Sequence, residues 1–169
     1  GGGFKSPNEV ASMVLLPLVR SKVDVPIIAA GGMVDGGTMA AAFALGAEGI
    51  QMGTRMVSAL ESPVHQNWKQ AIVDAPETGT VFLNKFHSPA LRALRTERTS
   101  RLEANAADNI MPEFGDAQAL YFGGDMEAAI PLSGQVAGRI ESIKPVADIL
   151  HETRDEFFRI LESLQRQYL

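Results

Sequence analysis

Two short apolar runs, each ending near glycine, constrain the fold of this chain more than any other feature of its sequence. The first run, PIIAAGG, covers residues 26–32, and the second, GIQMGT, covers residues 49–54. The alanine-rich stretch 35–47 between them has the length and composition of one helix. Parallel strands need a crossover of this kind, and such crossovers are right-handed. The pattern therefore predicts a parallel strand–helix–strand unit with bare backbone at both strand ends.

The glycines at the two strand ends predict a phosphate-binding site. Backbone amides there are unencumbered by side chains and can close around a phosphate group. In a (β/α)8 barrel the usual phosphate site lies on the loops after strands 7 and 8. The simpler interpretation is that these glycines only make tight turns between strand and helix. Two such loops in one unit favour a phosphorylated ligand or cofactor.

Composition narrows the class of protein. With 169 residues, 46% apolar and 21% charged, the chain is long enough for an ordinary globular domain with a core. A net charge of −5 argues against a nucleic-acid binder, which needs a basic surface. Cysteine is absent, and three scattered histidines make poor ligands, so we expect no metal site. No apolar stretch approaches the roughly 20 residues of a transmembrane helix and no signal peptide is visible, so we expect a cytoplasmic protein that does not bind membranes.

Hydrophobic periodicity and breaker residues predict the order of the elements. The predicted elements are a helix over 8–22, a strand over 25–30, a helix over 38–45 that ends at Gly46, a strand over 50–52, a helix over 64–75, an extended piece over 80–83, a helix over 89–105 and an amphipathic helix over 146–168. Asn8 is the expected N-cap of the first helix, and Pro17 should kink or break it. The continuous apolar run over 25–30 is typical of a strand buried on both faces.

The second half of the chain is predicted to be helical. The stretch 89–105 carries an arginine at every third position, at Arg92, Arg95, Arg98 and Arg101. This spacing would place the four side chains along one side of a helix. They could hold a cofactor's phosphate, or they could form a solvated, ion-paired face. We expect an α/β part over residues 1–84 and an all-helical part over residues 85–169.

Two stretches carry a specific resemblance to a known family. They are VPIIAAGGMVDG over residues 25–36 and AAFALGAEGIQMGTR over residues 41–55. The similarity extends along nearly the whole chain, through residues 61–65, Lys69, residues 87–101 and the SGQVAG element at 133–138. The chain resembles the C-terminal half of the nitronate monooxygenase (2-nitropropane dioxygenase) family and of the related flavin-dependent enoyl-ACP reductases.

The resemblance implies an FMN-binding (β/α)8 TIM barrel with an appended helical subdomain. Residues 26–30 would form strand 7 and residues 49–52 would form strand 8. The part over 1–84 would then be the C-terminal part of the barrel, about strands 6–8, and 85–169 would be the helical subdomain. Because a closed barrel needs eight strands, we expect the chain to be a fragment of a longer protein.

The same resemblance assigns the cofactor-binding residues. These are Gly2, Ala30, Gly31, Gly32, Met52, Gly53 and Thr54. Residues 30–32 match the family's strand-7 loop and Gly53 and Thr54 its strand-8 loop, both around the FMN phosphate, whereas Gly2 falls on the strand-6 loop. The amides of the two loops would converge on the phosphate dianion, and Thr54 could add a hydroxyl donor. Gln51 and Met52 have a competing interpretation, since a methionine at a strand end more often packs in the core.

The residue that would do acid–base chemistry is missing from its expected place. In the family, a loop after strand 6 presents a histidine over the flavin, but Phe4 occupies that position here. Phenylalanine cannot transfer a proton, so the catalytic residue is unknown, and Phe4 could simply pack over the flavin. His65 and His87 are candidate replacements, and Lys5 could be an electrophilic group, with loop-tethering histidines and a solvated lysine as the competing interpretation. His151 is expected at the surface.

Three functions stay open. The first is an FMN-dependent oxidoreductase that oxidises alkyl nitronates with O2. The second is an NAD(P)H-dependent flavin enoyl-thioester (enoyl-ACP) reductase, which the arginine-bearing helix mildly favours. The third is a truncated, inactive FMN-binding fragment. The expected partner is a small-molecule substrate, a nitronate or an enoyl thioester. An open barrel edge would favour a homo-oligomer or a complementary N-terminal barrel segment.

Overall fold

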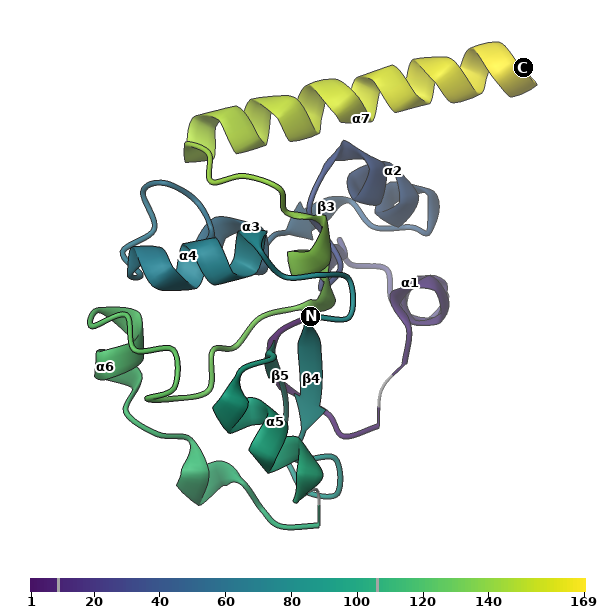
Figure 1. Ribbon diagram of the computed structural model, residues 1–169. Helices are drawn as coiled ribbons and strands as arrows, with labels where there is room; N and C mark the ends of the chain where they lie inside the picture. The colour runs from purple at the N-terminus through teal and green to yellow at the C-terminus, as the bar shows by residue number, and fades with distance from the viewer. Residues whose placement is uncertain (9, 106) are drawn as a thin grey trace.

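The computed structural model describes residues 1–8, 10–105 and 107–169. Its elements are, in chain order, β1 (Gly3–Lys5), α1 (Ser12–Arg20), β2 (Ile28–Ala30), α2 (Gly36–Ala44), β3 (Gly49–Gln51), α3 (Thr54–Val57), α4 (Gln66–Val73), β4 (Thr80–Leu83), β5 (Ala90–Leu94), α5 (Glu97–Ala104), η1 (Met111–Glu113), α6 (Ala117–Tyr121), η2 (Gln135–Arg139) and α7 (Val146–Tyr168). The long helix α7 lies over α2 on one side of the molecule, and β4, β5 and α5 lie on the opposite side (Figure 1).

Two small sheets organise the described residues. Strands β2 and β3 are parallel, with Ile28 opposite Gly49 and Ala30 opposite Gln51. Strands β1, β5 and β4 form an antiparallel sheet with β5 at its centre. The loop that the family resemblance places after strand 6 therefore forms β1 and pairs with β5. A mixed α/β architecture is present, as the sequence predicts.

The predicted β2–α2–β3 unit is confirmed. Asp35 caps α2, because its Oδ1 accepts a hydrogen bond of 2.8 Å from the Thr38 backbone N–H. In the reciprocal capping bond, Thr38 Oγ1 accepts a hydrogen bond of 3.1 Å from the Asp35 backbone N–H. At the other end Gly46 has a φ of 99°, the left-handed conformation that glycine adopts after a helix. These two ends set the length of the crossover helix. Because β2 and β3 are parallel and Ala30 lies opposite Gln51, both strands end at the same edge of the pair.

Strand β2 is buried on one face only, so the prediction of burial on both faces is wrong. Ala29 is 2% exposed and packs with Leu16 of α1 and Ala42 of α2. Ile28, by contrast, is 59% exposed. Successive side chains of a strand point to opposite faces, so Ile28 and Ala30 lie on the face away from those helices. Ala30 is exposed as well, so this second face of β2 is uncovered, and among the described residues β2 pairs with β3 alone.

Helix α1 begins later than predicted and passes through its proline. Its N-cap is Ala11 rather than Asn8, while residue 9 of the predicted helix lies outside the described residues. Pro17 lies inside the helix, which continues to Arg20, so the predicted break does not occur. A proline removes one backbone donor, but its carbonyl still accepts, and Ser21 N–H donates to Pro17 O at 3.0 Å. The helix therefore closes its last turn normally.

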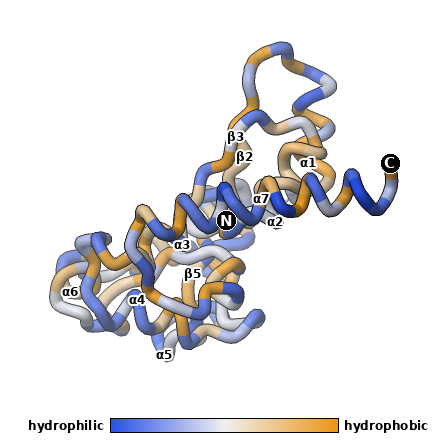
Figure 2. The backbone as a smooth tube through the Cα atoms, turned by 90° about the horizontal axis from the view of Figure 1, so that it is seen from above, coloured by the Kyte–Doolittle hydropathy of each residue, from blue (hydrophilic) through white to orange (hydrophobic). Residues whose placement is uncertain are grey.

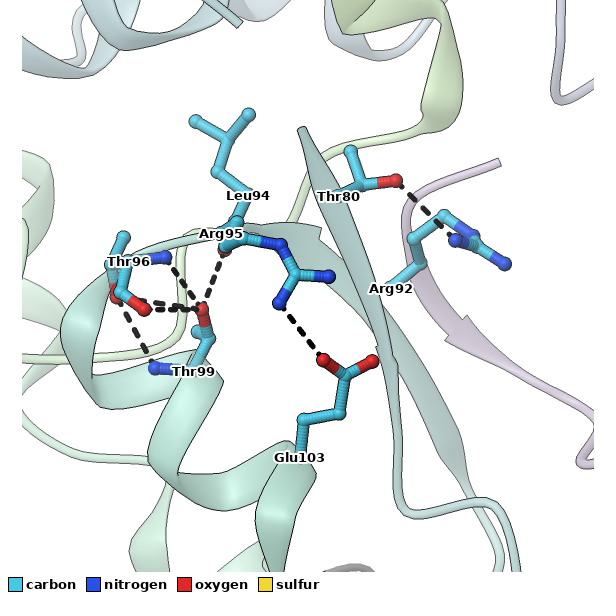
Figure 3. Close-up of polar contacts among 7 residues, drawn as sticks. All are labelled: Thr80, Arg92, Leu94, Arg95, Thr96, Thr99 and Glu103. Atoms are coloured by element: carbon cyan, nitrogen blue, oxygen red, sulfur yellow. Dashed lines mark hydrogen bonds and ion pairs between the residues drawn. The ribbon is translucent and has the colours of Figure 1, made fainter. Parts of the chain in front are cut away.

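The first part of the predicted basic helix is strand β5. Its residues Ala90, Leu91, Ala93 and Leu94 are between 0% and 3% exposed. Hydrogen bonds from β1 on one side and β4 on the other hold this strand at the centre of its sheet. Helix α5 begins only after Thr96, where Thr96 and Thr99 cap each other through bonds of 2.7 and 3.2 Å (Figure 3). Burial between β4, which precedes it in the chain, and the distant β1 overrides the helical spacing of this stretch.

The four arginines consequently do not share a helix face. Arg92 is on β5, Arg95 follows that strand, and only Arg98 and Arg101 are on α5. The expectation of an all-helical second part is wrong at β5. The boundary near residue 84 falls in the connection between β4 and β5, and the division into 1–84 and 85–169 stays a prediction.

The amphipathic helix predicted at the end of the chain is confirmed as α7. Its buried residues Ile149, Thr153 and Phe157 recur at a spacing of four, and polar and apolar residues alternate along it in Figure 2. The Phe43 ring of α2 meets the Phe157 ring edge-on at 5.1 Å. No helix among the described residues is long and apolar enough to cross a membrane.

Candidate ligand site at the strand ends

A cavity of about 190 Å³ lies where β2 and β3 end. It is lined by Gly1, Gly2, Ala30, Gly31, Gly32, Met33, Gln51, Gly53, Thr54 and Val136. The fold therefore brings the predicted cofactor-binding residues together around one cavity, with the exception of Met52. That these residues bind a cofactor stays a prediction.

Backbone rather than side chain forms much of the cavity wall. Gly31 and Gly32 each have a φ of 84°, a conformation that L-residues rarely adopt. A Cβ on Gly53 would meet no heavy atom within 4 Å, so the space in front of this residue is open. Backbone N–H groups at such positions can approach an anion closely because no side chain shields them.

Thr54 is the polar side chain that the sequence singled out, and its hydroxyl is held by a distant segment. It is 7% exposed, and its Oγ1 accepts a hydrogen bond of 2.8 Å from the Gly134 backbone N–H. Because the oxygen serves as acceptor in that bond, the hydroxyl proton can be donated to a ligand. This arrangement fits an acceptor-only group such as phosphate.

Met52 packs in the core, as the competing interpretation held. It is half-buried and lies against the apolar cluster that contains Ala29 and Ala47. Sequence reasoning did not assign Met33 or Val136 to the cavity, although both line it. Val136 belongs to the SGQVAG element, so the family resemblance at 133–138 was the available signal.

Phe4 does not line the cavity. Its side chain is 60% exposed and stacks on Phe114 with ring centroids 6.2 Å apart. Lys5, the next residue, lines an adjoining cavity of about 360 Å³ together with Gly31 and Gly32. Its Nζ lies 5.2 Å from the centre of the Phe82 ring. Lys5 is therefore closer to the glycine loops than the residue in the family's histidine position.

The histidines lie away from the cavity. His65 caps α4, and its Nδ1 accepts a bond of 3.1 Å from the Asn67 N–H. His87 Nε2 is 3.0 Å from the Ala107 carbonyl oxygen. His151 is exposed on α7. These contacts agree with tethering and surface roles. Among the described residues, no three His, Asp or Glu side chains are grouped closely enough to hold a metal ion.

The arginines of the predicted basic helix make separate contacts. Arg92 donates to Thr80 Oγ1 at 3.3 Å, and its guanidinium lies 5.3 Å from the centre of the Phe82 ring. Arg95 instead pairs with Glu103 at 2.9 Å on the far side of β5 and β4 (Figure 3). The four arginines of residues 92–101 therefore do not form a single row that could bind a phosphate group.

Comparison with known proteins places these features in a family. The family model of nitronate monooxygenase matches residues 1–155. A probable nitronate monooxygenase of Staphylococcus aureus (strain JH9) is 30% identical over 171 positions, which cover 95% of this chain and 48% of that protein. A probable nitronate monooxygenase of Staphylococcus saprophyticus is 34% identical over 105 residues, 62% of this chain and 29% of that protein. The chain thus spans half or less of these relatives.

Two solved structures share the fold. FabK from Thermotoga maritima is 40% identical, with a TM-score of 0.91, and the match covers 99% of this chain and 54% of FabK. A nitroalkane oxidase from Streptomyces ansochromogenes is 27% identical, with a TM-score of 0.75, and covers 92% of this chain and 46% of the oxidase. These matches confirm the predicted fold class, part of a TIM barrel with appended helices. The chain belongs to the nitronate monooxygenase family.

Proposed function

We propose that this chain is the FMN-phosphate-binding part of a flavin-dependent oxidoreductase. The observation that carries the proposal is the backbone-walled cavity at the ends of β2 and β3, with Gly31, Gly32 and Thr54 around it. The two left-handed glycines and the open space before Gly53 leave room for an anion against backbone N–H groups. The donor set therefore fits a phosphate group.

The size of the cavity indicates which part of FMN it would take. Its volume of about 190 Å³ is below the roughly 300–1,000 Å³ of pockets that enclose a whole ligand. This volume suits the phosphate end. The adjoining cavity, lined by Lys5 and Gln135, shares Gly31 and Gly32 with the first. The rest of the cofactor would extend in that direction.

The reaction that we propose first is oxidation of alkyl nitronates with O2. When bound, FMN supplies the redox chemistry, while the protein binds the cofactor and shapes the pocket. A nitronate is already deprotonated, so its oxidation does not require a base at position 4, where Phe4 stands. A neutral nitroalkane must first lose a proton, so it should be the poorer substrate.

The second candidate is an NAD(P)H-dependent enoyl-thioester reductase. The likeness to FabK, at 40% identity over 99% of this chain, is compatible with it. The arginine-bearing helix expected from the sequence does not support this reaction, because Arg92 and Arg95 lie outside α5. A third candidate is an inactive FMN-binding fragment, since the chain spans about half of its relatives. A cytoplasmic location, a homo-oligomer and a complementary N-terminal barrel segment stay predictions.

The first test is the absorbance spectrum of the purified protein, with mass spectrometry of any cofactor released on denaturation. We expect a flavin spectrum and FMN in the released fraction. A folded but colourless protein that takes up no added FMN would contradict the proposal. The reactions are then separated by two assays on the same sample. O2 consumption with an alkyl nitronate supports the first candidate, and NAD(P)H consumption with an enoyl thioester, in the absence of nitronate, supports the second.

A further inference from the structure

The hydrogen bond between Gly134 and Thr54 joins two distant parts of the chain at the edge of the candidate site. The Gly134 N–H donates to Thr54 Oγ1 at 2.8 Å, and the contact is buried. Thr54 lines the cavity at the end of β3, whereas Gly134 immediately precedes η2. The orientation of the Thr54 hydroxyl is therefore set by a residue outside the β2–α2–β3 unit.

The backbone at Gly134 packs closely against Gly2, a residue of the cavity wall. A Cβ on Gly2 would lie 2.6 Å from the carbonyl carbon of Ser133 and 2.7 Å from the nitrogen of Gly134. These distances are shorter than real Cβ contacts, so Gly2 lies directly against this backbone. Residues 133 and 134 are thus enclosed between Gly2 and Thr54, which both line the cavity.

The same backbone is anchored on its other side to the antiparallel sheet and to α4. Ser133 is 1% exposed, and its N–H donates to the Arg92 carbonyl at 3.2 Å. Its Oγ accepts a bond of 3.4 Å from Nε1 of Trp68, which is also 1% exposed. A segment fixed to β5 and α4 in this way cannot easily move away from Thr54.

The direction of this hydrogen bond has a chemical consequence. A hydroxyl group has one proton and can also accept. Since Gly134 donates to the Thr54 oxygen, the hydroxyl proton is not used in this bond and can be donated to an acceptor in the cavity. Phosphate oxygens accept hydrogen bonds, and bonds to charged acceptors are the stronger ones.

We propose that the Gly134 amide is a positioning group that holds the Thr54 hydroxyl as a donor to the phosphate group of the ligand. This inference rests on the proposed function, because it concerns the same site. It adds that the site distinguishes a phosphorylated flavin from its unphosphorylated analogue partly through Thr54. It also makes the backbone before η2 part of the phosphate site, although it lies about 80 residues further along the chain.

The test compares two substitutions at one position. Gly134→Ala keeps the N–H, and Gly134→Pro removes it, while both add a Cβ at 3.0 Å from the Gly2 nitrogen. The φ of Gly134 is −84°, close to the range that proline adopts. The alanine variant therefore controls for the added Cβ, whereas the proline Cδ also takes the place of the amide hydrogen that faces Thr54 Oγ1. Dissociation constants are measured for FMN and for riboflavin, which lacks the phosphate, by flavin fluorescence.

For Gly134→Pro we expect FMN binding about tenfold weaker than for Gly134→Ala, as for loss of a hydrogen bond to a charged group. Riboflavin binding should be the same in both variants, and a purely structural role would weaken the two ligands equally. An equal preference for FMN over riboflavin in the two variants would overturn the inference.

A second pair of variants keeps the inference testable if the proline variant does not fold. Thr54→Val removes the hydroxyl but keeps the side-chain shape, and Thr54→Ser keeps the hydroxyl. We expect Thr54→Val to lose most of the preference for FMN and Thr54→Ser to keep it. If wild type prefers FMN and Thr54→Val preserves that preference, the inference fails while the proposed function stands. If wild type shows no preference for FMN, both fail.

Discussion

Gly36, the first residue of α2, lies directly against the backbone of Phe157 in α7. A Cβ on Gly36 would collide with the Phe157 nitrogen and with the Thr153 carbonyl oxygen. The Gly36 N–H also donates to Glu156 Oε2 at 2.8 Å. The approach of the two helices therefore depends on the absence of a side chain at position 36. Since α2 connects the two strands that form the site, this contact joins α7 to the β2–α2–β3 unit.

The first prediction concerns this contact. Gly36→Ala should reduce the free energy of unfolding by about 1–3 kcal/mol, because the added methyl group forces α7 away from α2. Gly37→Ala is the matched control, since its Cβ would meet neighbours only at 3.4 Å and beyond. That variant should be neutral or stabilised by about 0.5–1 kcal/mol. Urea denaturation of both variants measures the difference, and equal stabilities would contradict the packing argument.

The second prediction separates ligand binding from stability at Gly53. Gly53 has a φ of −88°, which any residue can adopt, and its Cβ would enter open space. Gly53→Ala should leave the melting temperature unchanged or slightly higher, while FMN binding weakens because a methyl group fills part of the cavity. Gly32→Ala provides the contrast, since its φ of 84° makes an added side chain costly to the fold itself. Thermal unfolding without ligand and FMN titration measure the two effects. Unchanged FMN affinity in Gly53→Ala would argue against phosphate binding at this wall.

The third prediction concerns Arg55, a buried cation beside Thr54. Burial lowers the pKa of Arg55 from its ordinary value, an effect that the Glu152 carboxylate partly offsets. Its guanidinium donates to the Ser142 carbonyl at 2.9 Å and to Ser58 Oγ at 3.2 Å. Arg55→Met should reduce the free energy of unfolding by about 1–3 kcal/mol, because buried acceptors lose a charged donor.

Arg139→Met is the control for this substitution. The Arg139 side chain is 55% exposed and pairs with Asp35 at the surface, so its loss should cost at most about 1 kcal/mol. Both variants are compared by urea denaturation at one pH and salt concentration. An Arg55→Met variant as stable as Arg139→Met would show that the buried hydrogen bonds contribute little.

The fourth prediction concerns the exposed apolar surface where α1 borders the edge of β2 that has no strand partner among the described residues. Leu15 and Ile28 are 42% and 59% exposed, and both line a cavity of about 270 Å³ at this surface. Exposed apolar surface of this kind favours association. We expect the protein to associate with increasing concentration, and Ile28→Glu to shift it towards the monomer without loss of folding. Sedimentation velocity measures this shift.

Phe86 offers a control for that experiment. It is 75% exposed in the connection between β4 and β5, and it does not line the cavity beside α1 and β2. Phe86→Ser should leave the association unchanged. If both substitutions reduce association equally, or neither does, the surface along α1 and the edge of β2 is not the contact surface.

Elements whose signals are local were predictable from the sequence. The glycine-ended runs around β2 and β3 and the capped, alanine-rich α2 predicted a parallel unit, because strand length and helix caps are encoded within a few residues. The spacing of Ile149 and Phe157 likewise predicted α7, since one helix face repeats every three to four residues. The glycine loops identified the candidate site for the same reason. Gly31 and Gly32 are the first two residues after β2, and Gly53 is the second residue after β3.

The sequence alone determined the β2–α2–β3 unit, the amphipathic α7 and the positions of the glycine loops. Only the tertiary structure decided that residues 90–94 form β5, because the partners that bury this strand are β1 and β4 rather than its neighbours in a helix. It also decided that Ile28 faces outward, and that Gly134 meets Thr54. The physical reason is the same in each case. Burial and hydrogen-bond partners come from other segments, β4 just before β5 and β1 and Gly134 far along the chain, and the periodicity within one segment carries no information about them.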